Sequence, residues 1–553
     1  MPGPRTGSST PYSYILIRLL FRFVLKIFYG SIVVEGQANI PKTGRPCIVT
    51  SNHSNSLTDA LVLVTAIPPV DRNMLRLTAK ATQFGQRSFT SWLIEAAGTV
   101  PVKRRKDYAD GITVDNTDVM EKLMEALELG DAVCLFPEGL SRYHPTIAPL
   151  KTGVARLISD VLTRNRNDPD FEISLLNCSI TYMHRQHFRS DVLVSFHPPM
   201  TFSSKTHPEL LAPIDYKHIR QVTAQMYEQI SSGTIDAPSW DVVRLGKLAA
   251  RIYAPLGTRM RLGDHVRVVR AFIEAFKAFE GHTDASDDDE KRPELPELRL
   301  DLSKYQDQLT HWGLTDERVR RPTISRPLIF ARMVLRFVWA WCLFTLSLPG
   351  LVLWTPVFLT TFYAVHNFKK ASLDSLLHGC LTDSDPSRLG KPIFDTWDEI
   401  AQYKLIYGLM SGLVVWLGLS LVTFPFSAIT FMLVPALMWM ALRWLEDAVS
   451  AFRAFTAHLR LLLVGKSTLR AMQVQRKELY PRIMDFAVNA IGLPDNPEVY
   501  FTRRGGKEKG RVQGGWEFGT RYFSIKRRRK RDWEETLLYD VASLDLLDYP
   551  NEE

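Results

Sequence analysis

Short apolar runs alternate with amphipathic stretches along the first two hundred residues of the chain. Runs rich in β-branched and other apolar residues predict strands at 47–50, 75–79, 99–102, 132–136, 174–182 and 192–196. Helical periodicity between these runs predicts helices at 57–66, 88–97, 118–129 and 151–162. Strands that alternate with helices are typical of an α/β layer structure, so we expect an α/β domain with one sheet.

Two apolar blocks follow this region. Residues 337–365 form a run of 29 residues without a charge, and residues 405–442 form one of 38. Both exceed the roughly 20 residues that a helix needs to cross a bilayer core. Pro425 and Pro435 lie in the second block and predict a helical hairpin, whereas the first block fits one tilted span or a re-entrant pair. The excess of arginine flanking the blocks predicts that the N-terminal region and the tail are both cytosolic.

The N-terminus predicts an amphipathic helix at 12–29. Arg18, Arg22 and Lys26 recur at four-residue spacing on one helical face, which favours a helix in the membrane interface. A surface helix packed on the globular domain is the alternative. Further helices are expected at 219–232, 266–279 and 445–491, and an acidic linker at 284–290. The expected regions are an N-terminal membrane-associated helix (1–39), a catalytic domain (40–240), a helical extension (241–325), a transmembrane α-helical region (326–445) and a helical segment with a basic tail (446–553).

Net charge and cysteine spacing limit the kinds of molecule and metal that we expect this protein to bind. The formal net charge of +9 is concentrated in the basic run 526–531, which fits anionic lipid headgroups. Nucleic acid would also fit such a run, but the apolar blocks upstream favour the bilayer, so we expect no nucleic-acid partner; a solvated tail remains open. The five cysteines have no metal-ligand or redox-pair spacing, so neither a metal nor a disulfide framework is expected.

The run Asn52–Asp59 places a histidine and a carboxylate close together after a predicted strand. If a helix begins after Ser56, Asp59 falls in its first turn and can accept a hydrogen bond from His53. A carboxylate on Nδ1 fixes the tautomer and leaves Nε2 free to take a proton from a hydroxyl. The alternative is that Ser56 and Asp59 form a helix capping box and that His53 is an ordinary loop residue.

Two later strand ends carry further candidate residues. The strand predicted at 99–102 leads into a basic cluster where Arg104 could grip a phosphate, although a solvated basic loop would look the same. The strand predicted at 132–136 ends in Glu138 and Gly139, where a carboxylate can bind a polyol and the backbone can approach a ligand. A plain turn is the alternative there.

In this order, these residues resemble the four sequence blocks of the glycerolipid acyltransferase family, over roughly residues 40–199. The resemblance implies that His53 is the general base, that Asp59 is its partner, that Arg104 is a phosphate ligand, and that Glu138 and Gly139 bind the acceptor. It also implies that residues 177–182 and 187–190 form the fourth block, on the acyl-donor side. No cofactor is implied, because acyl-CoA enters as a co-substrate.

Three departures from the family pattern bear on the substrate. Five residues separate His53 from Asp59 where four are usual, a spacing that resembles the fungal glycerol-3-phosphate/dihydroxyacetone-phosphate acyltransferases. The third block continues Leu140-Ser141-Arg142, and Asn177 stands where the fourth block usually has proline.

The resemblance implies a multi-pass enzyme of the endoplasmic reticulum membrane that acylates the sn-1 hydroxyl of glycerol 3-phosphate and/or dihydroxyacetone phosphate, the first step of glycerolipid synthesis. A lysophosphatidate acyltransferase is the alternative within the class. A membrane adaptor that binds lipid without catalysis is the alternative outside it.

Overall fold

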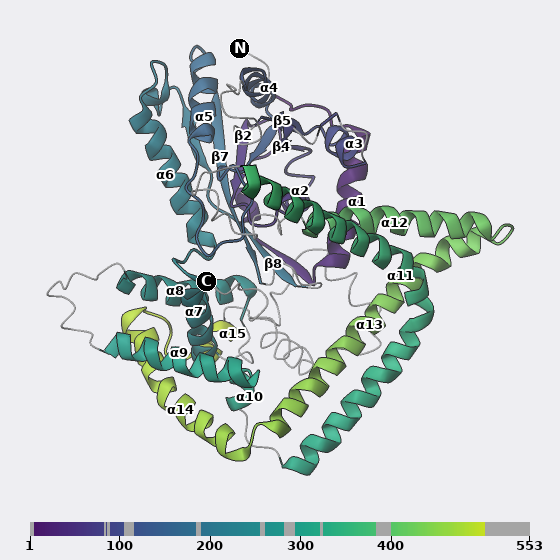
Figure 1. Ribbon diagram of the computed structural model, residues 1–553. Coiled ribbons are helices and arrows are strands. Elements are labelled where there is room, and N and C mark those ends of the chain that lie inside the picture. The colour runs from purple at the N-terminus through teal and green to yellow at the C-terminus, as the bar shows by residue number, and fades with distance from the viewer. Residues whose placement is uncertain are drawn as a thin grey trace. The chain divides into compact units, whose positions relative to one another are not determined.

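The computed structural model describes residues 5–81, 84–85, 89–103, 116–183, 190–254, 260–280, 294–320, 325–382 and 400–503 (Figure 1). By contacts, the chain divides into two compact units. The first consists of Met1–Thr234 with Val365–Ile406, and the second of Ile235–Ala364 with Tyr407–Glu553. The first unit's N-terminal segment ends at Thr234, a few residues before the expected end of the catalytic domain at 240. Each unit is described by itself below.

The first unit contains a mixed sheet of seven strands among the described residues, in the order β1-β8-β7-β2-β6-β3, with β9 paired to β7. The strands are β1 (Ser31–Glu35), β2 (Cys47–Ser51), β3 (Leu75–Arg76), β6 (Ala132–Leu135), β7 (Glu172–Tyr182), β8 (Asp191–Phe196) and β9 (Met200–Ser203). A separate two-stranded sheet pairs β4 (Thr78–Lys80) with β5 (Val100–Val102). The α/β class is confirmed, but the prediction of one sheet is wrong, because the run 75–79 breaks into two strands that join different sheets.

The centre of the large sheet is parallel. β2 pairs in parallel with β6 on one side and with β7 on the other, and Ser51 lies opposite Cys178. All five residues of β2 are buried, as expected for a parallel strand covered on both faces. The antiparallel pairs lie toward one edge, where β7 meets β8 and β9. β1 and β9 have no counterpart in the sequence prediction, because both are short and only weakly alternating.

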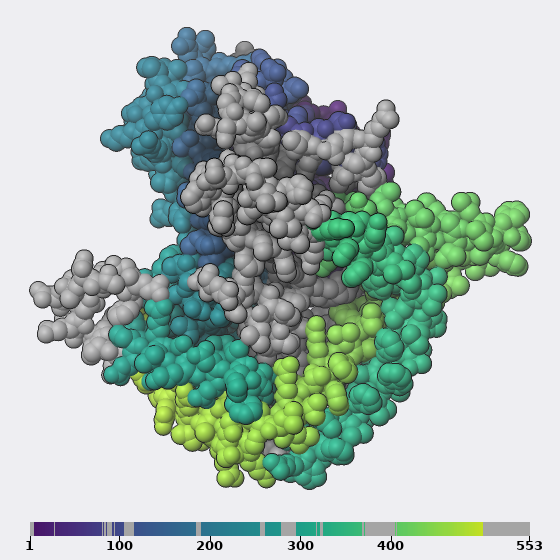
Figure 2. Space-filling model, in the orientation of Figure 1, coloured from purple at the N-terminus to yellow at the C-terminus, as the bar shows by residue number. Residues whose placement is uncertain are grey.

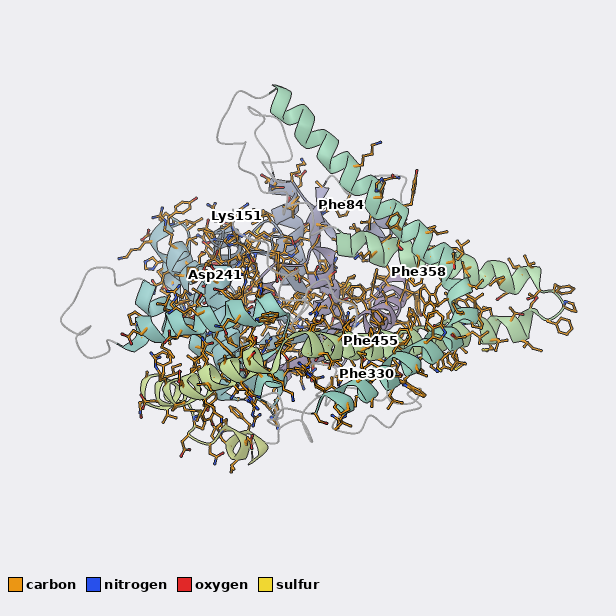
Figure 3. All side chains as sticks on the ribbon, turned by 60° about the horizontal axis from the view of Figure 1, so that its bottom comes forward. Phe84, Lys151, Asp241, Phe330, Phe358 and Phe455 are labelled. Atoms are coloured by element: carbon orange, nitrogen blue, oxygen red, sulfur yellow. The ribbon has the colours of Figure 1, made fainter. Side chains whose placement is uncertain are left out.

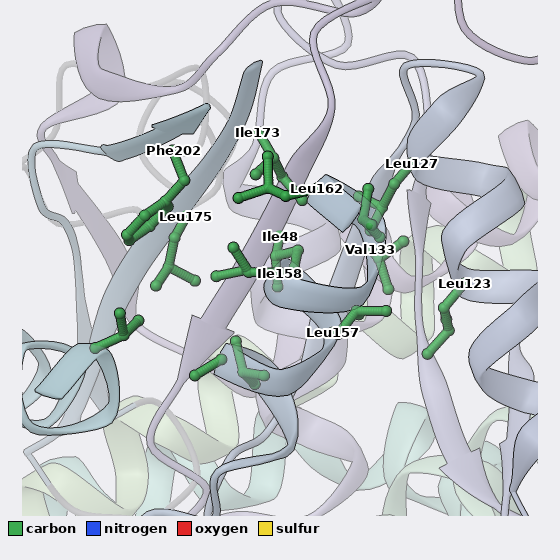
Figure 4. Close-up of a cluster of buried hydrophobic side chains, with 14 of the residues drawn as sticks. Ile48, Leu123, Leu127, Val133, Leu157, Ile158, Leu162, Ile173, Leu175 and Phe202 are labelled. Atoms are coloured by element: carbon green, nitrogen blue, oxygen red, sulfur yellow. The ribbon is translucent and has the colours of Figure 1, made fainter. Parts of the chain in front are cut away.

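Helices of the first unit follow the predicted pattern closely. They are α1 (Tyr12–Phe28), α2 (Leu57–Ala66), α3 (Phe89–Ala96), α4 (Thr117–Glu128), α5 (Gly153–Arg164) and α6 (Tyr216–Gly233). α4, α5 and α6 cover one face of the sheet. Their side chains enclose Ile48, Val133 and Leu175 in a buried core, and Figure 4 shows Leu157 and Ile158 of α5 against Ile48.

α1 packs on α2 and buries Tyr14, Ile17, Phe21 and Leu25. The guanidinium of Arg18 donates to main-chain carbonyls of Ile67 and Arg72. The first residue of the predicted cationic face is therefore tied to the domain. The exposed side of α1 carries large apolar side chains, at Tyr12, Ile15, Leu16, Leu19 and Phe23.

The second unit is helical throughout its described residues. Its helices are α7 (Trp240–Tyr253), α8 (Leu262–Glu280), α9 (Glu294–Trp312), α10 (Asp316–Arg320), α11 (Arg326–Thr382), α12 (Ile400–Val422), α13 (Ser427–Leu463), α14 (Lys466–Asp485) and α15 (Pro497–Arg503), with the ends of α11 and α12 counted in the first unit. The prediction of one helix at 445–491 is wrong in detail. This range contains the end of α13, then α14, and then a π-helical turn at Phe486–Ala490.

Buried ionic and aromatic contacts hold this unit together. Asp316, almost fully buried, accepts two bonds from the Arg476 guanidinium, at 2.8 and 3.1 Å, and a third from the Tyr305 hydroxyl at 2.8 Å. Phe276 stacks on Phe486 with ring centroids 6.0 Å apart. A buried charge paired in this way is satisfied and well oriented.

The two apolar blocks form three helices. The block 337–365 lies within the single helix α11, despite Pro349 and Pro356, so the re-entrant pair is wrong. The block 405–442 forms the predicted hairpin, α12 followed by α13. Trp354 of α11 donates its indole N–H to the Met438 carbonyl of α13 at 2.9 Å. Figure 3 labels Phe330 and Phe358 on α11 and Phe455 on α13, and the turn between α12 and α13 is light green in Figure 2.

Two helices, Arg326–Asn367 and Ser427–Leu463, are long and apolar enough to cross a membrane. Length and composition alone are weak evidence of a span. Large apolar side chains are exposed on both segments, among them Trp341, Val352, Phe362 and Met432.

Candidate active site

Two predicted residues, His53 and Glu138, lie with a third residue, Tyr182, where three neighbouring parallel strands end. His53 follows β2, Glu138 follows β6, and Tyr182 is the last residue of β7. Because the carboxyl ends of parallel strands lie at one edge of a sheet, ligand sites of α/β proteins form there. The pairing of β2 with both β6 and β7 brings these three side chains, far apart in sequence, to one place.

The contact predicted between His53 and Asp59 is present. His53 Nδ1 lies 2.9 Å from Asp59 Oδ2, and Asp59 is fully buried while the His53 side chain is 18% exposed. The His53 ring stacks on Phe136 with centroids 4.1 Å apart. Nε2 has no hydrogen-bond partner among the described residues. The imidazole is thus held by its contact at Nδ1, and its Nε2 atom stays available to a substrate.

The loop before α2 adopts a strained conformation that accommodates the fifth residue between His53 and Asp59. Ser56 has φ +48° and ψ −133°, and it is the one non-glycine residue with positive φ in the described chain. Its side chain makes no cap bond to α2, and its N–H donates to Ser141 Oγ at 2.9 Å. Asp59 instead accepts the N–H of Asn55 at 2.7 Å. The capping-box alternative is therefore wrong.

Glu138 links the β6 loop to the β2 loop. One of its carboxylate oxygens accepts the main-chain N–H of His53 at 2.6 Å, and the other accepts that of Ala148 at 3.2 Å. Glu138 is only 4% exposed, and burial raises the pKa of its carboxyl group despite these two bonds. Its visible contacts orient the backbone beside His53, and its predicted acceptor-binding role stays a prediction.

Gly139 makes the turn that follows. Its φ of +72° favours glycine, and a Cβ placed there would lie 2.5 Å from Lys151 Nζ. The Lys151 side chain therefore lies over the Gly139 backbone, just before α5. Lys151 is exposed, and its ammonium has no partner within the part of the chain that the structure describes.

Ser141 and Arg142, which depart from the usual third block, also contact the His53 loop. Ser141 Oγ accepts the Ser56 N–H, and the Arg142 N–H donates to the His53 carbonyl at 3.1 Å. The Arg142 guanidinium donates to the Thr146 carbonyl at 3.3 Å, while its buried Nε has no partner among the described residues. The altered third block thus connects the loop after β6 to the loop after β2.

Sequence reasoning did not single out Tyr182. Its hydroxyl donates to Asp59 Oδ1 at 2.5 Å, on the oxygen that His53 leaves free. Tyr182 belongs to the stretch that resembles the fourth block and ends a predicted strand, so its place at a strand end was the available signal.

Asn177, the third departure, sits inside the sheet. Its amide donates to Gln229 Oε1 at 2.7 Å and accepts the Thr50 hydroxyl at 2.5 Å. The side chain is fully buried and satisfied, so it ties β7 to β2 and α6.

Several predicted residues lie outside the described part of the chain: Arg104, residues 187–189 of the fourth block and the basic run 526–531. The described flanks of the Arg104 segment are joined, because Asn116 bonds the main chain of Lys103 through both amide atoms, at 3.0 and 2.9 Å. The predicted phosphate-binding role of Arg104 stays a prediction.

Cysteine chemistry does not enter this site. Cys47, Cys134 and Cys178 are buried free thiols. Burial raises the pKa of Cys47 to about 11 and that of Cys134 further. Within the described residues, no group of three or more His, Cys, Asp or Glu could hold a metal ion.

Comparison with known proteins identifies the class. Residues 31–175 match the family model described as Acyltransferase, and residues 246–377 match that of the Glycerol-3-phosphate acyltransferase 2 C-terminal domain. These two matches confirm the resemblance to acyltransferases that the sequence indicates. Both matched regions include described residues, and the first holds His53, Asp59 and Glu138.

Curated relatives are fungal. An uncharacterised acyltransferase of Schizosaccharomyces pombe is 26% identical over 402 residues, which are 70% of this chain and 55% of that protein. Glycerol-3-phosphate O-acyltransferase 2 of Saccharomyces cerevisiae is 26% identical over 47% of this chain and 33% of its own length. Glycerol-3-phosphate O-acyltransferase 1 of the same yeast is 23% identical over 46% and 32%. The matched part of this chain thus spans about half or a third of these relatives.

Among solved structures, the 1-acyl-sn-glycerophosphate (LPA) acyltransferase PlsC of Thermotoga maritima superposes with a TM-score of 0.27. The identity is 19%, over 39% of this chain and 80% of that one.

Proposed function

We propose that this protein is a membrane-bound, acyl-CoA-dependent O-acyltransferase that acylates the sn-1 hydroxyl of glycerol 3-phosphate and/or dihydroxyacetone phosphate. One observation carries the proposal: His53 Nδ1 lies 2.9 Å from the buried Asp59 carboxylate, inside a domain of the acyltransferase family, and its Nε2 is unpartnered among the described residues. A base oriented in this way suits proton removal from an alcohol.

The reaction needs no covalent acyl-enzyme. His53 Nε2 takes the proton of the acceptor hydroxyl as its oxygen attacks the thioester carbonyl. The tetrahedral intermediate collapses, the carbon–sulfur bond breaks, and the proton on Nε2 passes to the leaving thiolate. Asp59 stays ionised and stabilises the imidazolium between these steps. Holding the two substrates together supplies much of the rate.

The loops around His53 are suited to an anionic acceptor. Arg104 is the phosphate ligand that the family resemblance implies, and Glu138 and Gly139 are the acceptor-binding pair. Lys151, which lies over Gly139, adds a cation at the same turn. The charge of Lys151 would attract a phosphorylated acceptor, and Glu138 would keep the backbone beside His53 rigid.

The choice of glycerol 3-phosphate rests on three supports. The five-residue spacing between His53 and Asp59 resembles the fungal enzymes, the two yeast relatives are named for this acceptor, and residues 246–377 match a domain named for it. Lysophosphatidate is the alternative acceptor.

Membrane attachment follows from the exposed apolar helices. α11, α12 and α13 present side chains such as Phe362, Leu421 and Met432 on their surfaces, and α1 adds a further exposed apolar face. A surface of this kind is unstable in water and matches a bilayer. We place the protein in the endoplasmic reticulum membrane as a multi-pass protein, with the catalytic domain cytosolic.

A direct assay tests the function. Membranes that carry the full chain are incubated with labelled acyl-CoA and, separately, with glycerol 3-phosphate, dihydroxyacetone phosphate or lysophosphatidate, and the lipid product is identified. Membranes with the His53→Ala variant are the control, since this change removes the base and should lower turnover by about 10²-fold or more. A strong preference for lysophosphatidate would overturn the acceptor, and equal activity of the variant would overturn the mechanism. Binding of lipid without any transfer would favour a membrane adaptor.

A further inference from the structure

The buried carboxylate of Asp59 receives three hydrogen bonds. Oδ2 faces His53 Nδ1 at 2.9 Å and accepts the Asn55 N–H at 2.7 Å. Oδ1 accepts the Tyr182 hydroxyl at 2.5 Å. The phenol is thus the one side-chain donor other than the imidazole that reaches this carboxylate within the described residues. It comes from β7, 123 positions along the chain.

We propose that Tyr182 is a positioning residue for acyl transfer, which holds Asp59 ionised and correctly turned while His53 carries the acceptor's proton. This inference rests on the proposed function. The phenol keeps its own proton throughout: the bond that breaks is the acceptor O–H, and the bond that forms is Nε2–H on His53. Without the phenol, Oδ1 would be a buried anionic oxygen with no donor, and the carboxylate could rotate away from Nδ1 or take the proton itself.

The groups around Asp59 suit this role. The titratable groups that interact with it are His53, Tyr182, Glu138, Cys134 and Cys178, while Tyr29 lies beside Tyr182. Burial raises the pKa of Tyr182 well above its usual value, and that of both thiols as well, so all three remain neutral at physiological pH. Tyr182 is therefore a constant donor and never a second base.

Tyr29 provides a matched control. It is a buried tyrosine next to Tyr182, with ring centroids 6.0 Å apart, and its hydroxyl accepts a bond from the Asn55 side chain at 3.2 Å. The change Tyr29→Phe deletes the same atom from the same neighbourhood but leaves the Asp59 carboxylate with all three donors. A general packing role for the hydroxyls would make the two variants alike.

The test compares Tyr182→Phe with Tyr29→Phe and wild type in the full-length protein in membranes. Turnover is measured with acyl-CoA and each of the three candidate acceptors, at a temperature below every unfolding midpoint, and is expressed per folded enzyme. We expect Tyr182→Phe to lower kcat about 10- to 100-fold, the range for one bond to a charged group, with the KM for both substrates within twofold of wild type. Tyr29→Phe should keep kcat within about twofold.

Each other result is decisive. Normal kcat per folded enzyme in Tyr182→Phe overturns the inference, even if less of the variant is folded. A rise in KM alone, or an equal loss of kcat in Tyr29→Phe, overturns it as well. If wild type transfers no acyl group to any acceptor beyond the His53→Ala background, the proposed function itself fails, and this inference with it.

Discussion

The Glu138 carboxylate accepts the main-chain N–H of His53 at 2.6 Å, so the two sequence motifs are joined by a bond that involves neither the imidazole nor a substrate. The second carboxylate oxygen holds Ala148, ten residues further along its own loop. Glu138 thereby fixes the backbone from which the His53 ring projects. A glutamate at this place combines an orienting contact, which is visible, with the proposed acceptor-binding role.

This contact predicts a pH-dependent effect of Glu138→Gln. Burial raises the pKa of Glu138 above its ordinary value of 4.5, so the folded state holds its proton more tightly than the unfolded state. The stability contributed by this group is therefore fully present below about pH 4.5 and is lost as the pH rises through the folded pKa. The advantage of wild type over Glu138→Gln in unfolding midpoint should be largest near pH 4 and shrink toward pH 7.

Thermal unfolding at several pH values checks this expectation. The matched change Glu209→Gln, at an exposed glutamate, should shift the midpoint little at any pH. A wild-type advantage that grows from pH 4 to pH 7 would contradict the raised pKa.

Local spacing explains why part of the site was predictable. His53 and Asp59 are six positions apart on a strand–turn–helix, so their contact follows from the elements 47–50 and 57–66 alone. The bonds from Tyr182 to Asp59 and from His53 to Glu138 span 123 and 85 positions. They depend on β2 lying between β6 and β7, and strand order is set by packing of the whole sheet rather than by any local pattern.

The fold shows the same difference between elements set by the local sequence and elements set by packing of the whole sheet. The helix 57–66 was predicted to the residue because its apolar face, its length and its start after Ser56 are all local. The run 75–79 has the composition of one strand, yet its halves pair with β6 and β5 in different sheets. The helix α7 was missed although Asp241, Arg244, Lys247 and Arg251 recur at helical spacing between buried apolar residues, so the local signal for this helix was present in the sequence.

Substitution at Gly139 should perturb the turn and the lysine above it. In Gly139→Ala the methyl group would lie 2.5 Å from Lys151 Nζ at a φ of +72°, so the lysine must move and the backbone is strained. We expect a loss of about 1–2 kcal/mol in the free energy of unfolding and a higher KM for the proposed acceptor, glycerol 3-phosphate. Chemical denaturation and steady-state kinetics measure the two effects.

Gly153→Ala is the matched control. Gly153 begins α5, has no positive φ, and a Cβ there meets no atom within 4 Å. The variant should equal or exceed wild type in stability, because alanine favours helix. Equal losses in both variants would remove the special role assigned to the turn.

Ser56 offers a test of stored strain beside the proposed base, His53. Its φ of +48° is unfavourable for a residue with a side chain, and its N–H rather than its hydroxyl makes the bond to Ser141. Ser56→Gly should be more stable than Ser56→Ala by about 1 kcal/mol, since glycine adopts this conformation freely and alanine does not. Urea unfolding of the two variants measures the difference, and a more stable alanine variant would show that the loop relaxes instead.

Cys342 reports whether α11 lies in lipid. The thiol is exposed on the surface of the helix segment Arg326–Asn367. A polar maleimide does not enter the hydrocarbon core, so it should leave Cys342 unmodified in intact membranes and modify it after denaturation. Lys205→Cys, at a side chain 63% exposed in the first unit, should be labelled within minutes in the same membranes. Peptide mass spectrometry distinguishes the sites, and rapid labelling of Cys342 in intact membranes would place this part of α11 in water.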